Sequence, residues 1–267
     1  VGDKVGFPIR FGIDFSRFAL STTYDNLHGW KHILESRPLY NQGLGYSITY
    51  CTPNIKQTGI TGELQYLYVP TKSIKRLRVS RDFTHQAIHA GKIEVNKTRK
   101  IKRRVLDGDT SPQKISFSSD YQCVWLGTTR MLCSSDDRHQ IRLFLTGKVV
   151  RQHFTHRPTV TSSVNRYFHH YVFGVGSLGF SNKRCYEDRL VYGVGSTESI
   201  PYGSKVNLTY GYQFGEFVNR PYLRLDIAQG GRIQQLGHLY GAIFVGGFYH
   251  KKAVEQGIIQ LQLDYFT

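Results

Sequence analysis

The sequence predicts an all-β protein, and within that class an antiparallel transmembrane β-barrel of roughly 12–14 strands. Three observations support this prediction. Tyr and Phe are abundant, with 18 and 16 residues, and both favour a pleated, half-exposed strand surface. Apolar and polar residues alternate with a period of two along many segments. Several of these segments are about nine to eleven residues long, the length that a tilted strand needs to cross a bilayer.

The alternation is clearest in the last quarter of the chain. Every second residue is apolar in 206–214, 223–227 and 259–265, and the residues between them include Asn, Thr, Gln, Arg and Asp. Because successive side chains of a strand point to opposite faces, each segment has one apolar and one polar face. The same pattern occurs earlier, in residues 7–15, 44–50, 60–68, 141–145 and 167–175.

The composition of the two faces favours a membrane barrel over a soluble β-sandwich. The apolar faces carry Tyr and Phe near the segment ends, as the aromatic girdles of membrane barrels do. The polar faces hold Gln, Asn, Thr, Gly, Arg and Asp, which suits a wet lumen, whereas the outward face of a sandwich would favour Lys and Glu. A secreted, soluble β-sandwich that binds an anionic glycan remains the first alternative.

The connections predict one domain over residues 1–267, which is either a whole barrel or part of a larger one. Residues 229–232 and 250–252 are predicted as short turns, the first because its glycines permit positive φ. The polar stretches 25–41, 80–114 and 196–204 are predicted as long loops. Short strands at 92–96 and 101–106 are expected inside the second of them.

The charge is strongly positive, with a formal net value of +16, and it is concentrated between residues 72 and 104. Such a surface attracts anions, so we expect it to contact an anionic glycan or lipid, with a solvated loop or strand edge as the plainer interpretation. No nucleic-acid-binding motif accompanies the charge, and no nucleic-acid partner is expected. The residues proposed for this contact are Lys75, Arg76, Arg78, Arg99, Lys100, Lys102, Arg103 and Arg104.

No catalytic motif is present, and we expect no catalytic residue, metal or cofactor. The four cysteines lack metal-ligand spacing and are expected to be separate thiols. His153, His156, His169 and His170 fall close together in sequence, but their spacing does not predict a metal site. An outer-membrane hydrolase that uses these histidines with Glu187 and Asp188 is the second alternative. No run of about 18 apolar residues predicts a transmembrane helix.

The motifs in residues 189–203, 211–217, 219–225 and 256–266 resemble a group of Bacteroidota outer-membrane barrel proteins. That group is related, more loosely, to the bacterial surface-antigen (BamA-like) superfamily. The resemblance implies a location in the cell outer membrane and a non-enzymatic transport, assembly or surface role. It also implies lipopolysaccharide and other outer-membrane lipid, the barrel-assembly machinery and a periplasmic subunit as partners. Members of the group continue through further strands beyond the position of Phe266, so we expect this chain to be part of a longer barrel.

Overall fold

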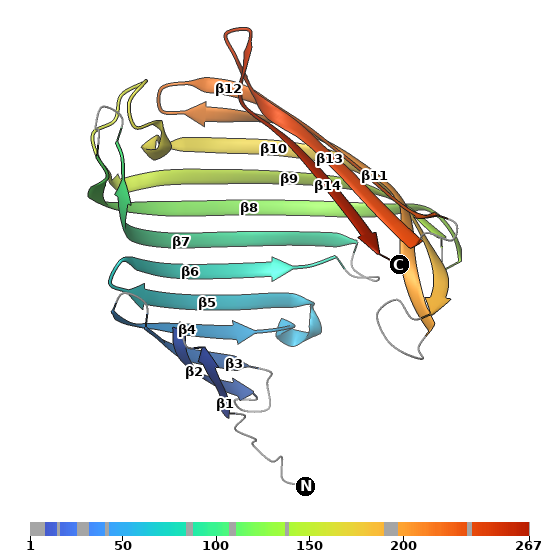
Figure 1. Ribbon diagram of the computed structural model, residues 1–267, viewed down its shortest axis with the longest axis horizontal. Helices are drawn as coiled ribbons and strands as arrows, with labels where there is room; N and C mark the ends of the chain where they lie inside the picture. The colour runs from blue at the N-terminus through green and yellow to red at the C-terminus, as the bar shows by residue number, and fades with distance from the viewer. Residues whose placement is uncertain are drawn as a thin grey trace. The chain divides into compact units, whose positions relative to one another are not determined.

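The computed structural model describes residues 9–14, 17–25, 32–40, 43–83, 88–106, 111–136, 139–189, 197–233 and 237–266. Within these ranges the protein is all-β, as predicted, and its strands form one antiparallel sheet (Figure 1). Two 3-10 turns, Ile55–Gln57 and Arg166–Phe168, are the only helical segments among the described residues. The strands are β1 (Ile9–Asp14), β2 (Arg17–Asp25), β3 (Ile33–Tyr40), β4 (Leu44–Thr52), β5 (Ile60–Val69), β6 (Lys72–Arg81), β7 (His89–Arg104), β8 (Gln113–Asp136), β9 (His139–His156), β10 (Tyr171–Arg189), β11 (Thr197–Gly215), β12 (Asn219–Ile233), β13 (Gly237–His250) and β14 (Ala253–Phe266).

The order of the 14 strands in the sheet is their order in the chain, from β1 to β14. Each strand therefore pairs with its sequence neighbours, so local turns are enough to build the topology. In the β13–β14 turn, Lys251 and Lys252 have φ values of 46° and 63°, which match the positive values of a tight hairpin turn. Among the described residues no pairing joins β1 to β14, so the sheet has two edges and closure into a barrel is not part of the structure.

The chain divides into two compact units, which we describe separately. Unit 1 comprises residues 1–125, 149–172 and 215–218, and unit 2 comprises residues 126–148, 173–214 and 219–267. In unit 1 a small aromatic core forms from β8, β9 and the 3-10 turn that follows β9. Phe168, which is 1% exposed, packs edge-on against Phe117 and Phe154, with ring centroids 5.2 and 5.7 Å away.

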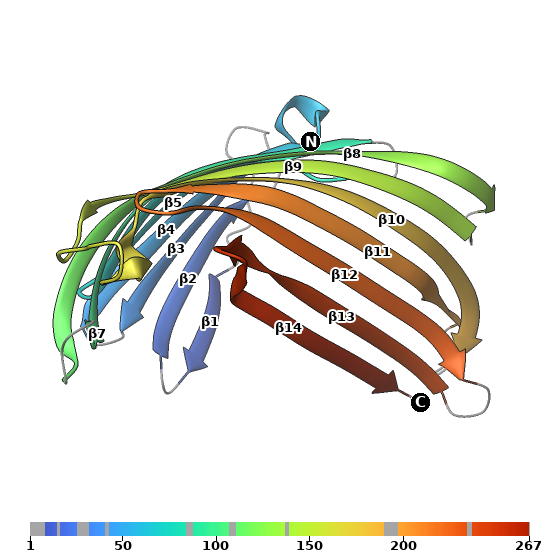
Figure 2. The same cartoon turned by 90° about the horizontal axis from the view of Figure 1, so that it is seen from above.

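In unit 2, strands β11 to β14 lie side by side in a regular antiparallel array (Figure 2). On one face of this array the register aligns apolar residues of neighbouring strands, and a slip by one residue would turn every side chain to the other face. Leu208 pairs with Leu225, which pairs with Val245 on its other side. The only recorded irregularity in these pairings lies between Gly246 and Phe248, where β13 meets β14.

Several predicted connections are strands instead. Residues 229–232 belong to β12 and pair with β13, and Gln229 and Gly230 also pair with β11, so backbone pairing continues through the glycines. Residues 25–41 contain β3, and β11 begins at Thr197 within the predicted loop 196–204. The predicted turn at Lys251–Lys252 is confirmed.

The predicted loop 80–114 contains one long strand, β7, in place of two short ones. Its many cations do not interrupt it, because the strand is held by backbone pairing with β6.

The alternating segment 167–175 becomes a strand later than predicted, because β10 begins at Tyr171. Tyr167 and His169 therefore lie in the connection before it and not on a strand. Residues 7–8 and Phe15 of the first alternating segment lie outside the described residues.

Candidate functional site

In unit 2, apolar side chains of β11 to β14 share one face of the sheet, and they are exposed. Leu208, Leu225, Val245 and Ile259 form a row across the four strands, and 48%, 38%, 45% and 81% of their surfaces are accessible. We call the surface on which such side chains gather the apolar face. A soluble protein rarely exposes a contiguous apolar patch of this kind unless the patch is an interaction surface.

On β11 and β12 the opposite side, the polar face, is more buried than the apolar face. Thr209 is buried, and Asn207, Arg224 and Asp226 are half-buried. Asp226 accepts hydrogen bonds from Asn207 Nδ2 at 3.1 Å and from Arg224 Nε at 2.5 Å. The hydroxyls of Ser177 and Thr209 are 2.7 Å apart. On β11 and β12 the exposed face is therefore apolar and the more buried face is polar, the reverse of the arrangement in a soluble sheet.

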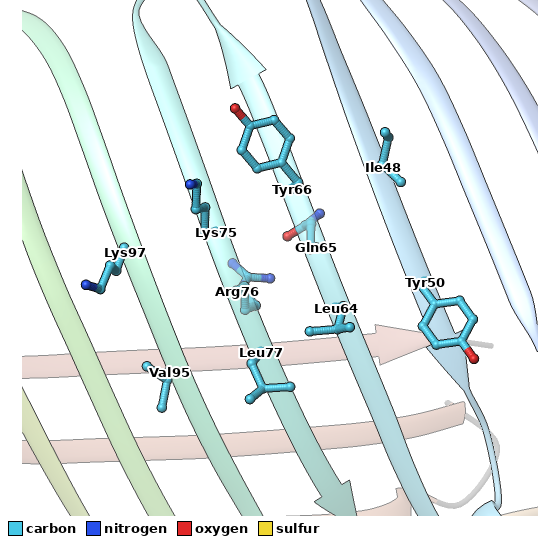
Figure 3. A pocket seen from close by; sticks show the side chains of 10 residues that line it. All are labelled: Ile48, Tyr50, Leu64, Gln65, Tyr66, Lys75, Arg76, Leu77, Val95 and Lys97. Carbon is cyan, nitrogen blue, oxygen red and sulfur yellow. The ribbon is translucent and has the colours of Figure 1, made fainter.

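Strands β4 to β7 of unit 1 have the same two faces. The apolar face carries Leu64, Leu77 and Val95, which are direct cross-strand neighbours, and all three are exposed. On the same face, toward the β5–β6 turn, the rings of Tyr46 and Tyr66 lie 5.6 Å apart. Figure 3 shows such side chains on the near side of the strands, with Gln65 and Arg76 behind the ribbon.

The polar face of β5 to β7 is organised around the carboxylate of Glu94. Its side chain is 10% exposed and lies 3.3 Å from Arg78, 3.6 Å from Lys92 and 3.7 Å from Arg76. Arg78 also contacts Glu63, at 3.5 Å. Carboxylates and cations therefore alternate across the three strands, an arrangement that stabilises a sheet through opposite-charge cross-strand pairs.

The eight cations predicted to contact a glycan or lipid do not share one surface. Because alternate residues point to opposite faces, β6 and β7 divide them into two sets. Arg104 stacks on Tyr167, with its guanidinium carbon 4.0 Å from the ring centroid, and so it lies on the face of the aromatic core. Lys75, Arg99 and Arg103 occupy the apolar face, whereas Arg76, Arg78, Lys100, Lys102 and Arg104 occupy the polar face.

A further polar cluster in unit 1 joins the connection after β9 to the β11–β12 turn. Arg157 donates hydrogen bonds from Nη1 and Nη2 to the Glu216 carboxylate, at 2.7 and 2.8 Å. The His170 backbone N–H donates to the same carboxylate at 3.1 Å, and His170 Nδ1 accepts the Phe154 N–H at 3.0 Å. The His153 ring stacks on His170 at 4.3 Å. We call Arg157, Glu216 and His170 the loop clamp.

The loop clamp shifts the pKa values of both acidic and basic members. The Arg157 hydrogen bonds, with help from the His170 N–H, lower the pKa of Glu216 to about 2. Burial, and then the positive charge of Arg157, lower the pKa of His170 below its ordinary 6.5. Glu216 and His170 each bind a proton more weakly in the folded clamp than in an open one, so their protonation opposes the closed form.

We therefore expect the clamp to be closed at neutral pH and to loosen as the pH falls, in two stages. His170 is protonated first, below 6.5, and its Nδ1 can then no longer accept the Phe154 N–H. Glu216 follows, with stability lost from its ordinary 4.5 down to about 2. Amide hydrogen exchange at Phe154, corrected for the intrinsic effect of pH, should accelerate between about pH 7.5 and pH 5. His170→Gln is the control, and its exchange should not change over that interval; equal wild-type protection at both pH values would contradict the prediction.

Among the described residues, the structure brings together no group of three His, Cys, Asp or Glu side chains that could hold a metal. Of the clustered histidines, His153 and His170 meet, while His169 Nε2 bonds to the Thr161 carbonyl at 2.8 Å. The side chains of Glu187 and Asp188 lie outside the described residues. Cys51, Cys123, Cys133 and Cys185 are free thiols.

Sequence reasoning did not find the loop clamp. Arg157 and Glu216 are 59 residues apart, and neither lies in a recognisable motif, so only the fold brings them together. The alternation did contain the signal that divides the eight cations between two faces.

No helix in the described ranges is long and apolar enough to cross a membrane. Comparison of the chain with protein-family models, with curated proteins and with solved structures gives no match.

Proposed function

We propose that this chain forms all or part of a β-barrel embedded in the bacterial outer membrane, with a transport, assembly or surface role and no enzymatic step. The observation that carries the proposal is the reversed polarity of the sheet. Exposed side chains such as Leu225 and Ile259 lie opposite the hydrogen-bonded network of Asn207, Arg224 and Asp226. Lipid is the environment in which such an arrangement has the lowest free energy.

The dimensions of the apolar face fit this environment. On β11 the apolar positions run from Val206 to Phe214, and a tilted strand needs about nine to eleven residues to cross a bilayer. Phe214 lies at the end of this stretch next to the β11–β12 turn, where aromatic side chains are expected at a membrane interface. Val206, Leu208 and Leu225 carry no polar group that lipid would leave unsatisfied.

Hydrogen bonding supports closure of the sheet in the mature assembly. Lipid offers no partner for the free N–H and C=O groups of an edge strand, so only closed barrels cross membranes as sheets. Strands β1 and β14 must therefore pair, within this chain or with further strands. We propose that the barrel-assembly machinery inserts the protein and that a periplasmic subunit is a further partner.

A refolding experiment tests the proposal. Denatured protein is diluted either into vesicles of neutral lipid or into plain buffer. We expect strand-rich circular dichroism and resistance to alkaline carbonate washing in the vesicles, and aggregation in buffer. A stable, strand-rich monomer in plain buffer that does not associate with vesicles would exclude a membrane barrel and favour the soluble sandwich.

Conductance then separates the roles that the proposal leaves open. The polar face of β6 and β7 carries more cations than carboxylates, including Arg76, Arg78 and Lys100. If this face lines a continuous pore, planar-bilayer recordings should give steady conductance that favours anions. The absence of conductance would favour an assembly or surface role.

A further inference from the structure

On three neighbouring strands of unit 1, the apolar face changes abruptly to polar side chains. Leu77 and Val95 are direct cross-strand neighbours, and so are Lys75 and Lys97, one step along the same face. The change therefore runs straight across these two strands, as the edge of a bilayer would. It falls between Leu77 and Lys75 on β6 and between Val95 and Lys97 on β7. On the next strand, β8, the exposed side chains change in the same way, from Val124 to Gln122.

Among the described residues, the cations just beyond this boundary have no acidic side chain within salt-bridge distance. Lys75 and Lys97 are directly opposite each other, an arrangement that destabilises a sheet unless an anion lies between them. Arg99 follows on the same face. In the part of the chain that the structure describes, no salt bridge involves any of these three residues, and Asp120 of β8 makes none with them. The polar face of the same strands, by contrast, pairs its cations with Glu63 and Glu94.

The surface next to these cations suits an acyl chain. An open hollow of about 670 Å³ lies there, with Ile48, Leu64 and Leu77 among its lining residues (Figure 3). Lys75 and Lys97 border it, and the Lys75 Nζ lies 5.8 Å from the centroid of the Tyr66 ring. An apolar hollow with ammonium groups at one end is complementary to a lipid whose head carries phosphate.

The length of the cationic strip favours a phosphorylated glycolipid over a glycerophospholipid. The strip follows β7 from Lys97 through Arg99 to Arg103, with Ile101 between the two arginines, for about 20 Å at roughly 3.3 Å per residue. The phosphates of glycerophospholipids lie at one depth, whereas those of a phosphorylated saccharide head extend away from the bilayer. A strip perpendicular to the boundary matches the second arrangement.

We infer that Lys75, Lys97, Arg99 and Arg103 form a binding site for the phosphorylated head of lipopolysaccharide, whose acyl chain occupies the neighbouring hollow. The inference rests on the proposed membrane location, and it divides the predicted anion-binding residues. Arg76, Arg78, Lys100, Lys102 and Arg104 lie on the other face and take no part. Lys97, which the sequence did not single out for this contact, belongs to the site.

The test compares two triple variants with equal loss of charge. Lys75→Gln/Lys97→Gln/Arg99→Gln removes the site, and Lys72→Gln/Lys100→Gln/Lys102→Gln removes three cations from the polar face of the same strands. Both are inserted into neutral vesicles that contain a trace of lipopolysaccharide, and the bound lipid is quantified after purification. We expect the first variant to lose about a hundredfold in affinity, from roughly equal contributions of three cations at a membrane surface. The second should stay within about twofold of wild type.

Further arms identify the ligand and control for folding. The wild-type protein should bind dephosphorylated lipopolysaccharide as weakly as the first variant binds intact lipopolysaccharide. Neither phosphatidylglycerol nor inorganic phosphate should compete with lipopolysaccharide for the wild-type site. Lys75→Arg/Lys97→Arg should retain binding, which excludes a mere folding defect. Equal losses in the two triple variants, or equal binding of phosphatidylglycerol, would overturn the assignment. Binding is measured only on carbonate-resistant protein, so a failure to insert counts against the membrane proposal and not against this site.

Discussion

Replacing Leu225 by arginine is expected to destabilise the membrane-inserted protein by about 2–4 kcal/mol, the cost of placing a guanidinium near the middle of a bilayer. Leu225 is the middle residue of the apolar stretch 223–227 of β12, and it pairs with Leu208 on one side and Val245 on the other. Its side chain is 38% exposed, so the arginine would meet no crowded protein neighbours. The measurement is the free energy of unfolding by urea in lipid vesicles.

Gln229→Arg supplies the matched control for this substitution. Gln229 lies on the same strand and the same face, four residues farther along and beyond the apolar stretch. Near an interface the same arginine costs only about 0–1 kcal/mol. In a soluble protein both positions would be exposed to water, and both changes would stay within about 0.5 kcal/mol of wild type. A dependence on depth along one strand thus separates a lipid environment from an aqueous one, and two equal small effects would contradict the membrane proposal.

The strands of the last quarter were predictable because their side chains obey a single rule. Over residues 206–214 of β11, 223–227 of β12 and 259–265 of β14, every second residue is apolar, and the sequence there reveals both the strand and its faces. Strand β7 does not obey the rule over its full length. From Lys97 onward cations lie on both faces of β7, so apolar and polar residues no longer alternate there. For this reason the segment was predicted as a loop with short strands.

The candidate site was predictable only as far as local sequence determines it. A period of two divides Lys75 from Arg76 and Arg99 from Lys100, so the two cationic faces follow from the strand once it is recognised. Strand register does not follow in the same way. That Lys75 meets Lys97, and that Arg78 lies between Glu63 and Glu94, depends on turn lengths and pairing that the sequence pattern leaves open. Whether the strands close into a barrel stays a prediction.

Glu94→Gln is expected to be the most disruptive single change on the polar face of unit 1. The carboxylate is the shared partner of Arg76, Arg78 and Lys92, at 3.3 to 3.7 Å. Removing its charge leaves three neighbouring cations that repel one another. Breaking a fully buried ion pair costs about 3–5 kcal/mol, and the partial exposure of these cations reduces the expected loss to about 2–3 kcal/mol.

Glu63→Gln is the control for this substitution. Glu63 has a single cation within salt-bridge distance among the described residues, Arg78 at 3.5 Å, and its side chain is 23% exposed. Its loss should cost at most about 1 kcal/mol. The free energies of unfolding of both variants are measured by urea unfolding in vesicles at low and high salt. The destabilisation caused by Glu94→Gln should be smaller at high salt, because salt screens the remaining cations. Equal costs for the two variants would mean that the cations around Glu94 are already neutralised by solvent ions.

A second substitution at Arg78 tests whether repulsion is the cause. If the loss in Glu94→Gln comes from uncompensated charge, Arg78→Gln in the same chain should recover part of it, because one of the crowded cations is removed. If the loss of stability comes instead from a missing hydrogen bond or from altered packing, the destabilising effects of Glu94→Gln and Arg78→Gln should add. A positive recovery would identify Glu94 as the carboxylate that allows so many cations to share one sheet face. It would also explain how β6 and β7 pair while their polar face carries so many basic side chains.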